Sequence, residues 1–218
     1  MLTDVDLPAP GLLWTRWATL SATLTGIGHA GLWSIDDHGA HHADPDGNWA
    51  RFALLDGRRA VLYGHHGEHS ATAQADPPLD LLTGAPDWLP WDDLGPLAEA
   101  GRLGFVIWHE SGRWSRVRYQ GALDDGMAPM LDPLLSAENT LAALTAVVTG
   151  PGRYELTSPA QREQVRAASE RLLHAAVRAD VGAGHLEDLL GRLTGPVLDT
   201  GAALAVAARA GIMPGNRA

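Results

Sequence analysis

Six of the ten histidines lie in two short clusters, at 38–42 and at 65–69. Imidazole nitrogens alternating with carboxylates are typical ligands of zinc, nickel or iron, so the sequence predicts a possible divalent-metal site. The candidate ligands are His41, His42, His65, His66 and His69. Their spacing matches no established metal motif, and two alternatives stay open. The histidines either belong to a solvated polar loop or act as acid–base or ligand-contacting groups, because imidazole titrates near neutral pH.

A second candidate site lies in the segment RWSRVR, where Trp114, Arg116 and Arg118 alternate along the chain. Alternation places these three side chains on one face of a strand. Such a face could stack a base or hold a carboxylate or phosphate, which predicts a site for a small anionic ligand. The alternative is that the arginine stems cover apolar rings on a half-exposed sheet.

Several classes of catalytic site are excluded by the sequence. It contains no cysteine, no lysine for a Schiff base, no GxSxG segment and no phosphate-binding GxxxxGK[ST] loop. The segment Asp44-Pro-Asp-Gly-Asn48 resembles the start of a calcium loop but lacks the distal bidentate glutamate, so we interpret it as a turn.

The formal net charge is −10, and all sixteen basic residues are arginine, a pattern typical of a GC-rich genome. This charge disfavours nucleic acid and anionic membranes and suits a basic protein partner. The N-terminus carries acidic residues where a signal peptide is positive, and no apolar run reaches the roughly 20 residues of a membrane helix. We expect a soluble, cytoplasmic protein.

The elements that position these residues begin with two hairpins. The segment 50–63 contains Asp56-Gly57 between apolar runs, which predicts a two-residue type I′ turn with Leu55 opposite Arg58 and Phe52 opposite Val61. The segment 104–119 is expected to turn at Ser111-Gly112, with Glu110 opposite Arg113. We expect both hairpins in one antiparallel sheet. The histidine-bearing segments 36–48 and 65–69 would then converge at one end of that sheet.

The remaining segments are predominantly helical by pattern. An amphipathic helix is expected at 12–26, with Leu13, Trp17, Leu20 and Leu24 buried and the threonines opposite, and a short helix ends near Gly101. Residues 36–48 are expected to be a loop. After Ser136, helices are expected at 136–149, 158–180, 185–193 and 198–210, the last of them buried. The prediction is an α+β fold, with a sheet domain at 1–135 and a helical block at 136–218 packed on it.

The segment ADPDGNWARFALLDGRRAVLYGHHGEHS resembles a group of uncharacterised actinobacterial proteins, over roughly residues 30–120. The resemblance implies a bacterial source and no particular activity. At the level of fold class alone, an acidic α+β chain of this kind is also similar to immunity proteins that neutralise toxins.

These observations favour a non-enzymatic binding or interaction protein of the immunity or regulator kind, with a protein partner. One alternative is a metal-dependent enzyme or metal-binding protein that uses the clusters at 38–42 and 65–69. Another is a binder of a small anionic ligand on the Trp114, Arg116 and Arg118 face. Neither membrane nor nucleic acid is an expected partner.

Overall fold

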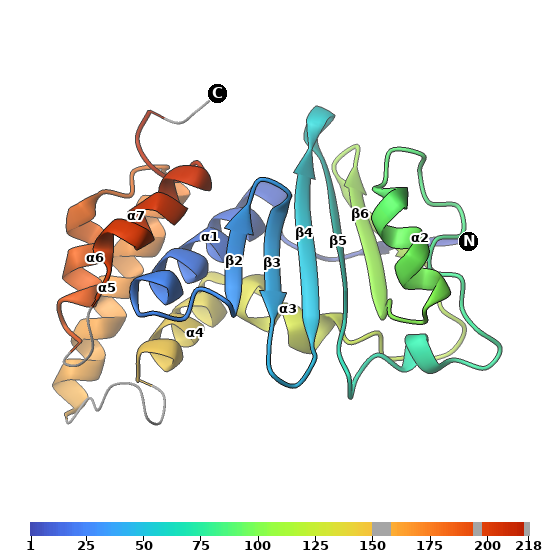
Figure 1. Cartoon of the computed structure of the whole chain (residues 1–218), viewed down its shortest axis with the longest axis horizontal. Coiled ribbons are helices and arrows are strands. Elements are labelled where there is room, and N and C mark those ends of the chain that lie inside the picture. Colours follow the sequence, from blue (N-terminus) through green and yellow to red (C-terminus); the bar gives the residue numbers. More distant parts are fainter. Residues whose placement is uncertain (150–157, 194–197, 216–218) are drawn as a thin grey trace. The chain divides into compact units, whose positions relative to one another are not determined.

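A computed structural model describes residues 1–149, 158–193 and 198–215 of the chain. It has the α+β fold expected from the sequence, with a seven-stranded antiparallel sheet of order β1-β7-β6-β5-β4-β3-β2 (Figure 1). The strands are β1 (Leu2–Val5), β2 (Trp33–Asp36), β3 (Gly39–Ala43), β4 (Trp49–Leu55), β5 (Arg59–His65), β6 (Phe105–Glu110) and β7 (Arg113–Val117).

Helices precede, interrupt and follow the strands. The α-helices within the described residues are α1 (Pro10–Gly26), α2 (Trp91–Glu99), α3 (Met127–Leu135), α4 (Ala137–Thr149), α5 (Pro159–Val177), α6 (Ala183–Leu190) and α7 (Thr200–Arg209). Two short 3₁₀ turns cover Asp56–Arg58 and Ala71–Gln74. The sequence pattern did not predict α3, whose segment MAPMLDPLL contains two prolines, Pro129 in the first turn and Pro133 further along. Proline is tolerated in the first turn of a helix but is unfavourable in its interior, so this segment does not look helical.

The chain divides into two compact units. The sheet unit contains Met1–Pro10 and His41–Asp132, and the helical unit contains Gly11–Ala40 and Pro133–Ala218. The sequence placed a boundary at 135, close to the second of these junctions. It assigned the N-terminal helix to the sheet domain, whereas α1 and β2 belong to the helical unit.

The first hairpin forms, but its predicted turn and register were wrong. Leu55 pairs with Arg59 and Phe52 with Leu62, one residue away from the expected partners. The turn contains three residues instead of two, and Arg58 adopts a positive φ of 62° at its end. A tight turn closed by one left-handed residue is the usual three-residue alternative to type I′. The extra residue moves every cross-strand partner by one.

The second hairpin is confirmed as expected. Glu110 pairs with Arg113, and the two turn residues Ser111 and Gly112 both have positive φ, 54° and 82°. Positive φ at both central positions is the requirement of a type I′ turn. The two hairpins lie side by side in one sheet, as expected, because β5 pairs antiparallel with β6.

The segment 36–48 is only partly a loop, which corrects the sequence expectation. Residues Gly39–Ala43 form β3, and the turn is confined to Asp44–Asn48. Asp44 organises that turn: its Oδ1 accepts from the backbone N–H groups of Asp46 and Asn48, both at 3.0 Å. Short polar and small residues hid the strand, because GAHHA lacks the β-branched residues that mark one.

The core of the sheet unit lies between the sheet and α2, which lies beside β6 in Figure 1. Val61, Val106 and Trp108 supply the sheet side, and Leu94 of α2 is fully buried against the same cluster. The sequence predicts that Trp88 and Trp91 hold the proline-rich segment 70–91 on the core; Trp88 does pack on this core, whereas Trp91 is exposed. The core therefore fixes α2 over the strands that carry the polar residues described below.

The helical unit confirms most of the helical pattern. The stripe of Leu13, Trp17, Leu20 and Leu24 on α1 is buried. The threonine side was expected to be polar, but Thr19 and Thr23 are buried too. Their hydroxyls donate to the carbonyls four residues earlier, at 2.8 and 2.9 Å, so burial leaves neither donor unsatisfied.

The C-terminal helices differ in detail from the expectation. The capping box at Ser158 and Gln161 is present and begins α5, which ends at Val177. The helical pattern predicts a buried side of Leu172, Leu173, Ala176 and Val177; the first three are buried, but Val177 is 53% exposed. On α7, Ala203 and Ala207 are buried while Leu204 is only half-buried, so the helix buries one face. The sequence also predicts breaks between helices at Gly150-Pro151 and Gly195-Pro196, and both pairs lie outside the described residues.

Candidate functional site

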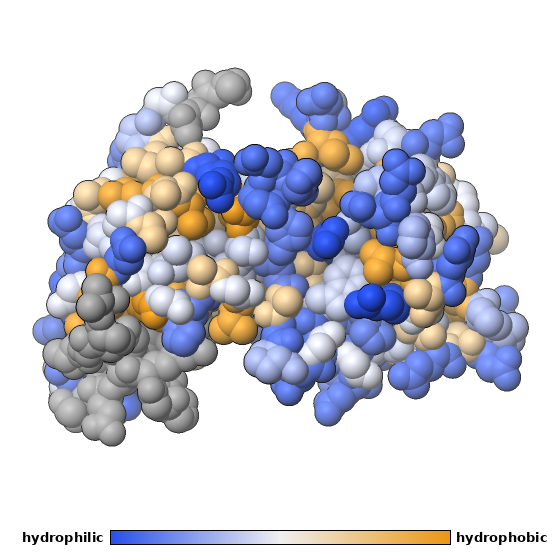
Figure 2. All heavy atoms as spheres, viewed as in Figure 1, coloured by the Kyte–Doolittle hydropathy of each residue, from blue (hydrophilic) through white to orange (hydrophobic). Residues whose placement is uncertain are grey.

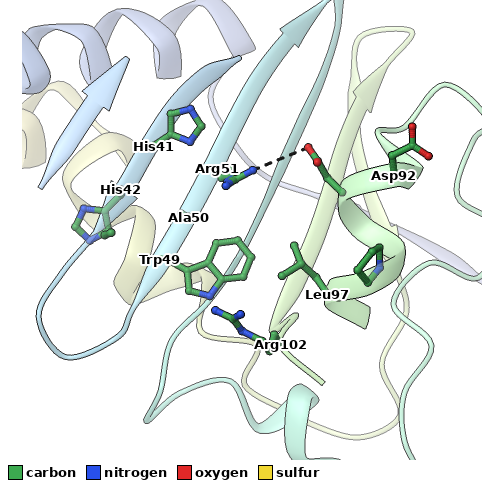
Figure 3. Close-up of a pocket in the computed structure, with 11 residues that line it drawn as sticks. His41, His42, Trp49, Ala50, Arg51, Asp92, Leu97 and Arg102 are labelled. Atoms are coloured by element: carbon green, nitrogen blue, oxygen red, sulfur yellow. Dashed lines mark ion pairs between the residues drawn. The ribbon is translucent and has the colours of Figure 1, made fainter. Parts of the chain in front are cut away.

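A groove of about 520 Å³ lies in the sheet unit between β3, β4 and α2 (Figure 3). We call it the β4–α2 groove. It is lined by His41, His42, Ala43, Trp49, Ala50, Arg51, Asp92, Asp93, Pro96, Leu97 and Arg102. Its volume falls within the range of small-molecule sites. Over this part of the sheet unit, Figure 2 shows hydrophilic residues surrounding smaller apolar areas.

One end of the groove is closed by charged groups that neutralise one another. Arg51 Nη1 on β4 lies 3.9 Å from Asp93 Oδ2 in the first turn of α2, and the Tyr63 hydroxyl donates to the same oxygen at 3.4 Å. Burial raises the pKa of Tyr63, which keeps its hydroxyl protonated as a donor. Asp93 also lies at the helix N-terminus, where a negative charge is favourable. This end is therefore electrostatically satisfied.

The other end of the groove joins an aromatic ring to a cation. Trp49 begins β4, is half-buried, and packs edge-on against Tyr63, with ring centroids 6.1 Å apart. Figure 3 shows Leu97 beside the Trp49 indole and Arg102 just below it. The Arg102 backbone N–H donates to the Leu97 carbonyl at 2.9 Å, which fixes the residue just beyond α2. Within the described residues the exposed Arg102 guanidinium forms no ion pair.

His65 contributes to the electrostatics of this end from the end of β5, where it pairs with Trp49. Its Nδ1 is buried and has no hydrogen-bond partner within the described residues. Burial lowers the pKa of His65, and the charges of His66 and Arg102 lower it further. At neutral pH the imidazole is uncharged, so Arg102 carries the positive charge next to Trp49.

The structure does not gather the five histidines predicted as metal ligands. His41 and His42 line the β4–α2 groove, and His65, His66 and His69 do not. His66 and His69 pack edge-on with ring centroids 4.7 Å apart, and His69 Nδ1 lies 3.1 Å from Asp124 Oδ2. Within the described ranges, no group of three or more His, Asp or Glu side chains has an arrangement that could hold a metal ion.

The second predicted site is largely used for internal contacts. Trp114 is buried and its indole N–H donates to the Pro8 carbonyl at 2.9 Å. Arg116 forms an ion pair with the buried Asp125 and stacks over the Tyr119 ring, 4.2 Å from its centroid. Arg118 lies beyond the end of β7 and is exposed. The alternative interpretation, with arginine stems covering aromatic rings, describes Arg116 well.

The sequence patterns do not identify the residues that supply the aromatic ring and the cations of the groove. Trp49 and Arg51 stand two apart on β4, so alternation alone places them on one face. This signal was present in WARF but was read only as part of a hairpin. Arg102 follows α2 in a polar turn, and no local pattern connects it with β4. Its position depends on the packing of α2 on the sheet.

Comparison with protein families, with curated proteins and with solved structures finds no match to this chain. In the residues that the structure describes, no helix has both the length and the apolar character needed to cross a bilayer. The geometry of the groove is therefore the basis for assigning a function.

Proposed function

We propose that the protein is a non-enzymatic binding protein and that the β4–α2 groove takes a small-molecule ligand. The observation that carries this proposal is the combination of Trp49 and Arg102, which has no ion-pair partner in the described ranges, at one end of an open groove of about 520 Å³. Ligand sites typically combine apolar and aromatic lining with a few converging polar groups, and this groove has both.

The charged residues of the groove support binding more directly than chemistry. Asp93 is shared between Arg51 and the Tyr63 hydroxyl, so its oxygen holds α2 against β4. A general base needs a carboxylate or imidazole placed within reach of a substrate proton, and Asp93 is already held by an ion pair with Arg51 and a hydrogen bond from the Tyr63 hydroxyl. Arginine stays protonated at all physiological pH values and binds anions without transferring a proton.

The sequence also predicts a cytoplasmic location, from its acidic N-terminus and short apolar runs, and a basic protein partner, from its net charge of −10. Both stay predictions, and the groove proposal does not depend on either of them. A protein partner could use the acidic surface while the groove holds a small molecule.

The proposal is tested by a small-fragment screen, followed by NMR of the ¹⁵N-labelled protein. We expect binders to shift the Trp49 indole and the Arg102 backbone signals. Ala43→Trp should abolish these shifts, because Ala43 is exposed at the end of β3 and lines the groove, where an indole would fill the space. Ala71→Trp is the matched control, since Ala71 is exposed in the same unit but outside the groove.

Two results would contradict the proposal. One is that no fragment shifts groove signals in the parent protein. The other is that shifts persist in Ala43→Trp to the same extent as in the control, which would place the binding elsewhere.

A further inference from the structure

We infer that the ligand of the β4–α2 groove is a flat ring that carries an anionic group, either a phosphate or a carboxylate. This inference rests on the proposed function and specifies the chemistry of its ligand. The ring lies on Trp49, and the anion is held by Arg102. The contacts of Trp49 support the ring, and the charges around Arg102 support the anionic group.

The surroundings of Trp49 indicate that the ligand contains a flat ring. The edge-on contact with Tyr63, at an interplanar angle of 81°, holds the indole in one orientation. Leu97 packs on the core from α2, and Figure 3 shows it beside the indole, where it forms the apolar side of the same space. A fixed indole beside an aliphatic side chain favours a flat, apolar guest, because stacking on an indole needs a π face.

The distribution of charge along the groove indicates that the ligand carries an anionic group. Arg51 is neutralised by Asp93, whereas Arg102 has no carboxylate partner in the described part of the chain. Burial lowers the pKa of the nearby His65, and the charges of His66 and Arg102 lower it further, so this imidazole adds no positive charge at neutral pH. The planar guanidinium of Arg102 can form two parallel hydrogen bonds with a carboxylate or a phosphate.

The opposite end of the groove limits the size of the anion. Asp92 and Asp93 line that end, at the first turn of α2, while Arg102 follows the last turn of the same helix. A ligand with negative charge along its whole length would meet both carboxylates. The groove therefore selects a small molecule with its charge at one end, and it excludes an extended polyanion such as a nucleic acid strand.

The test compares a complete probe with its two halves by isothermal titration calorimetry. The probes are adenosine 5′-monophosphate, adenosine and ribose 5-phosphate. We expect the monophosphate to bind at least tenfold more tightly than either half. Indole-3-acetate and indole form a second pair, in which the anion is a carboxylate. Tighter binding of the anionic member in either pair supports the inference, and the pair that shows it identifies the anionic group.

Variants separate the two contacts. Arg102→Gln should remove the preference for the monophosphate over adenosine, and Arg113→Gln should leave it unchanged. Arg113 is an exposed arginine on β7 of the same unit, outside the groove, and its substitution changes the net charge equally. Trp49→Leu should weaken both adenosine and the monophosphate at least fivefold and leave ribose 5-phosphate unaffected.

The inference is overturned if the anionic probes bind no better than their neutral rings, or if Arg102→Gln changes nothing relative to Arg113→Gln. If uncharged fragments still shift the Trp49 and Arg102 signals in that case, the proposed function stands and only the ligand class is wrong. If no fragment shifts them, the proposed function fails as well.

Discussion

Asp125 is the buried carboxylate that joins β7 to the loop after β5. Its Oδ2 accepts from Arg116 and from the Tyr119 hydroxyl, and its Oδ1 accepts from the Met127 backbone N–H at 3.0 Å. Its carbonyl accepts from the Ser70 hydroxyl at 2.9 Å. Burial raises the pKa of Tyr119, as does the nearby charge of Asp125, so the phenol stays a donor. The acid therefore satisfies partners from three segments at once.

We expect Asp125→Ala to lower the free energy of unfolding by about 3 kcal/mol, because removal of one partner leaves the other charge of a buried pair uncompensated. The Arg116 side chain keeps 25% of its surface exposed, which holds the loss at the lower end of the usual range. Urea unfolding measures the effect, and Asp87→Ala, an exposed carboxylate in the same unit, is the control. Equal stability of the two variants would show that the Asp125 network contributes nothing.

His65 gives the protein a specific pH dependence. Because its pKa in the folded protein lies below the unfolded value of about 6.5, the unfolded chain binds the proton more readily. The stabilisation is fully present above the unfolded pKa and is lost as the pH falls through the folded pKa. Asp44 and Asp188 also have lowered pKa values, but as carboxylates they act only below about pH 4.

We therefore expect the unfolding free energy to decrease as the pH falls from about 7.5 to about 5.5, and His65→Gln to reduce that decrease. His38→Gln, at an exposed histidine, should follow the parent protein. Thermal unfolding at a series of pH values measures the difference. Parallel curves for the parent and both variants would rule out His65 as the origin.

Residue types in the sequence indicate which side chains could form a site, but they do not indicate which side chains lie together in the fold. Asp125 was visible only as half of an Asp-Asp pair in a turn, since nothing local indicates that Arg116 and Tyr119 fold over it. Alternation along β7 indicates the face on which Arg116 lies, but only the ion pair with Asp125 shows that its side chain makes internal contacts. Clustered histidines indicate a metal site only when the fold brings their side chains together, and of the five candidates only His41 and His42 lie at the groove.

The two hairpins show how far a turn sequence determines the length of a turn and the register of its strands. Ser111-Gly112 forms the two-residue turn that its sequence predicted, while Asp56-Gly57 forms a three-residue turn that ends at Arg58. β5 buries residues on both of its faces, whereas β4 buries Ala50 and Phe52 and exposes Arg51. The apolar pattern of β5 therefore does not distinguish neighbouring registers, and the turn sets the register of this hairpin.

Arg58 adopts the left-handed conformation, which costs a non-glycine residue roughly 1–2 kcal/mol. We expect Arg58→Gly to raise the free energy of unfolding by about 0.5–1 kcal/mol, after the larger chain entropy of glycine is taken into account. Arg58→Ala removes the same side chain but keeps the strained conformation, so it should not stabilise the protein. Urea unfolding of both variants separates the two effects. A stabilised alanine variant would attribute the gain to the lost side chain instead.

The chain passes through the helical unit at residues 11–40, after β1 and before the rest of the sheet unit. Helical periodicity predicted most helices, because their apolar stripes and caps are local signals. The assignment of α1 and β2 to the same unit as α4–α7 depends on long-range contacts, such as those between α7 and β2, which no local pattern indicates. The same limit applies to the β4–α2 groove, whose walls come from segments far apart in the sequence.

The proposed ligand of the β4–α2 groove is a flat ring with an anionic group, bound between Trp49 and Arg102. The most direct measurement is a crystal structure of the protein soaked with adenosine 5′-monophosphate. We expect the purine stacked on the Trp49 indole and the phosphate within hydrogen-bond distance of the Arg102 guanidinium, with the Arg51–Asp93 pair intact. A groove that stays empty at saturating concentrations of both the nucleotide and indole-3-acetate, or a ligand bound away from both residues, would contradict this assignment.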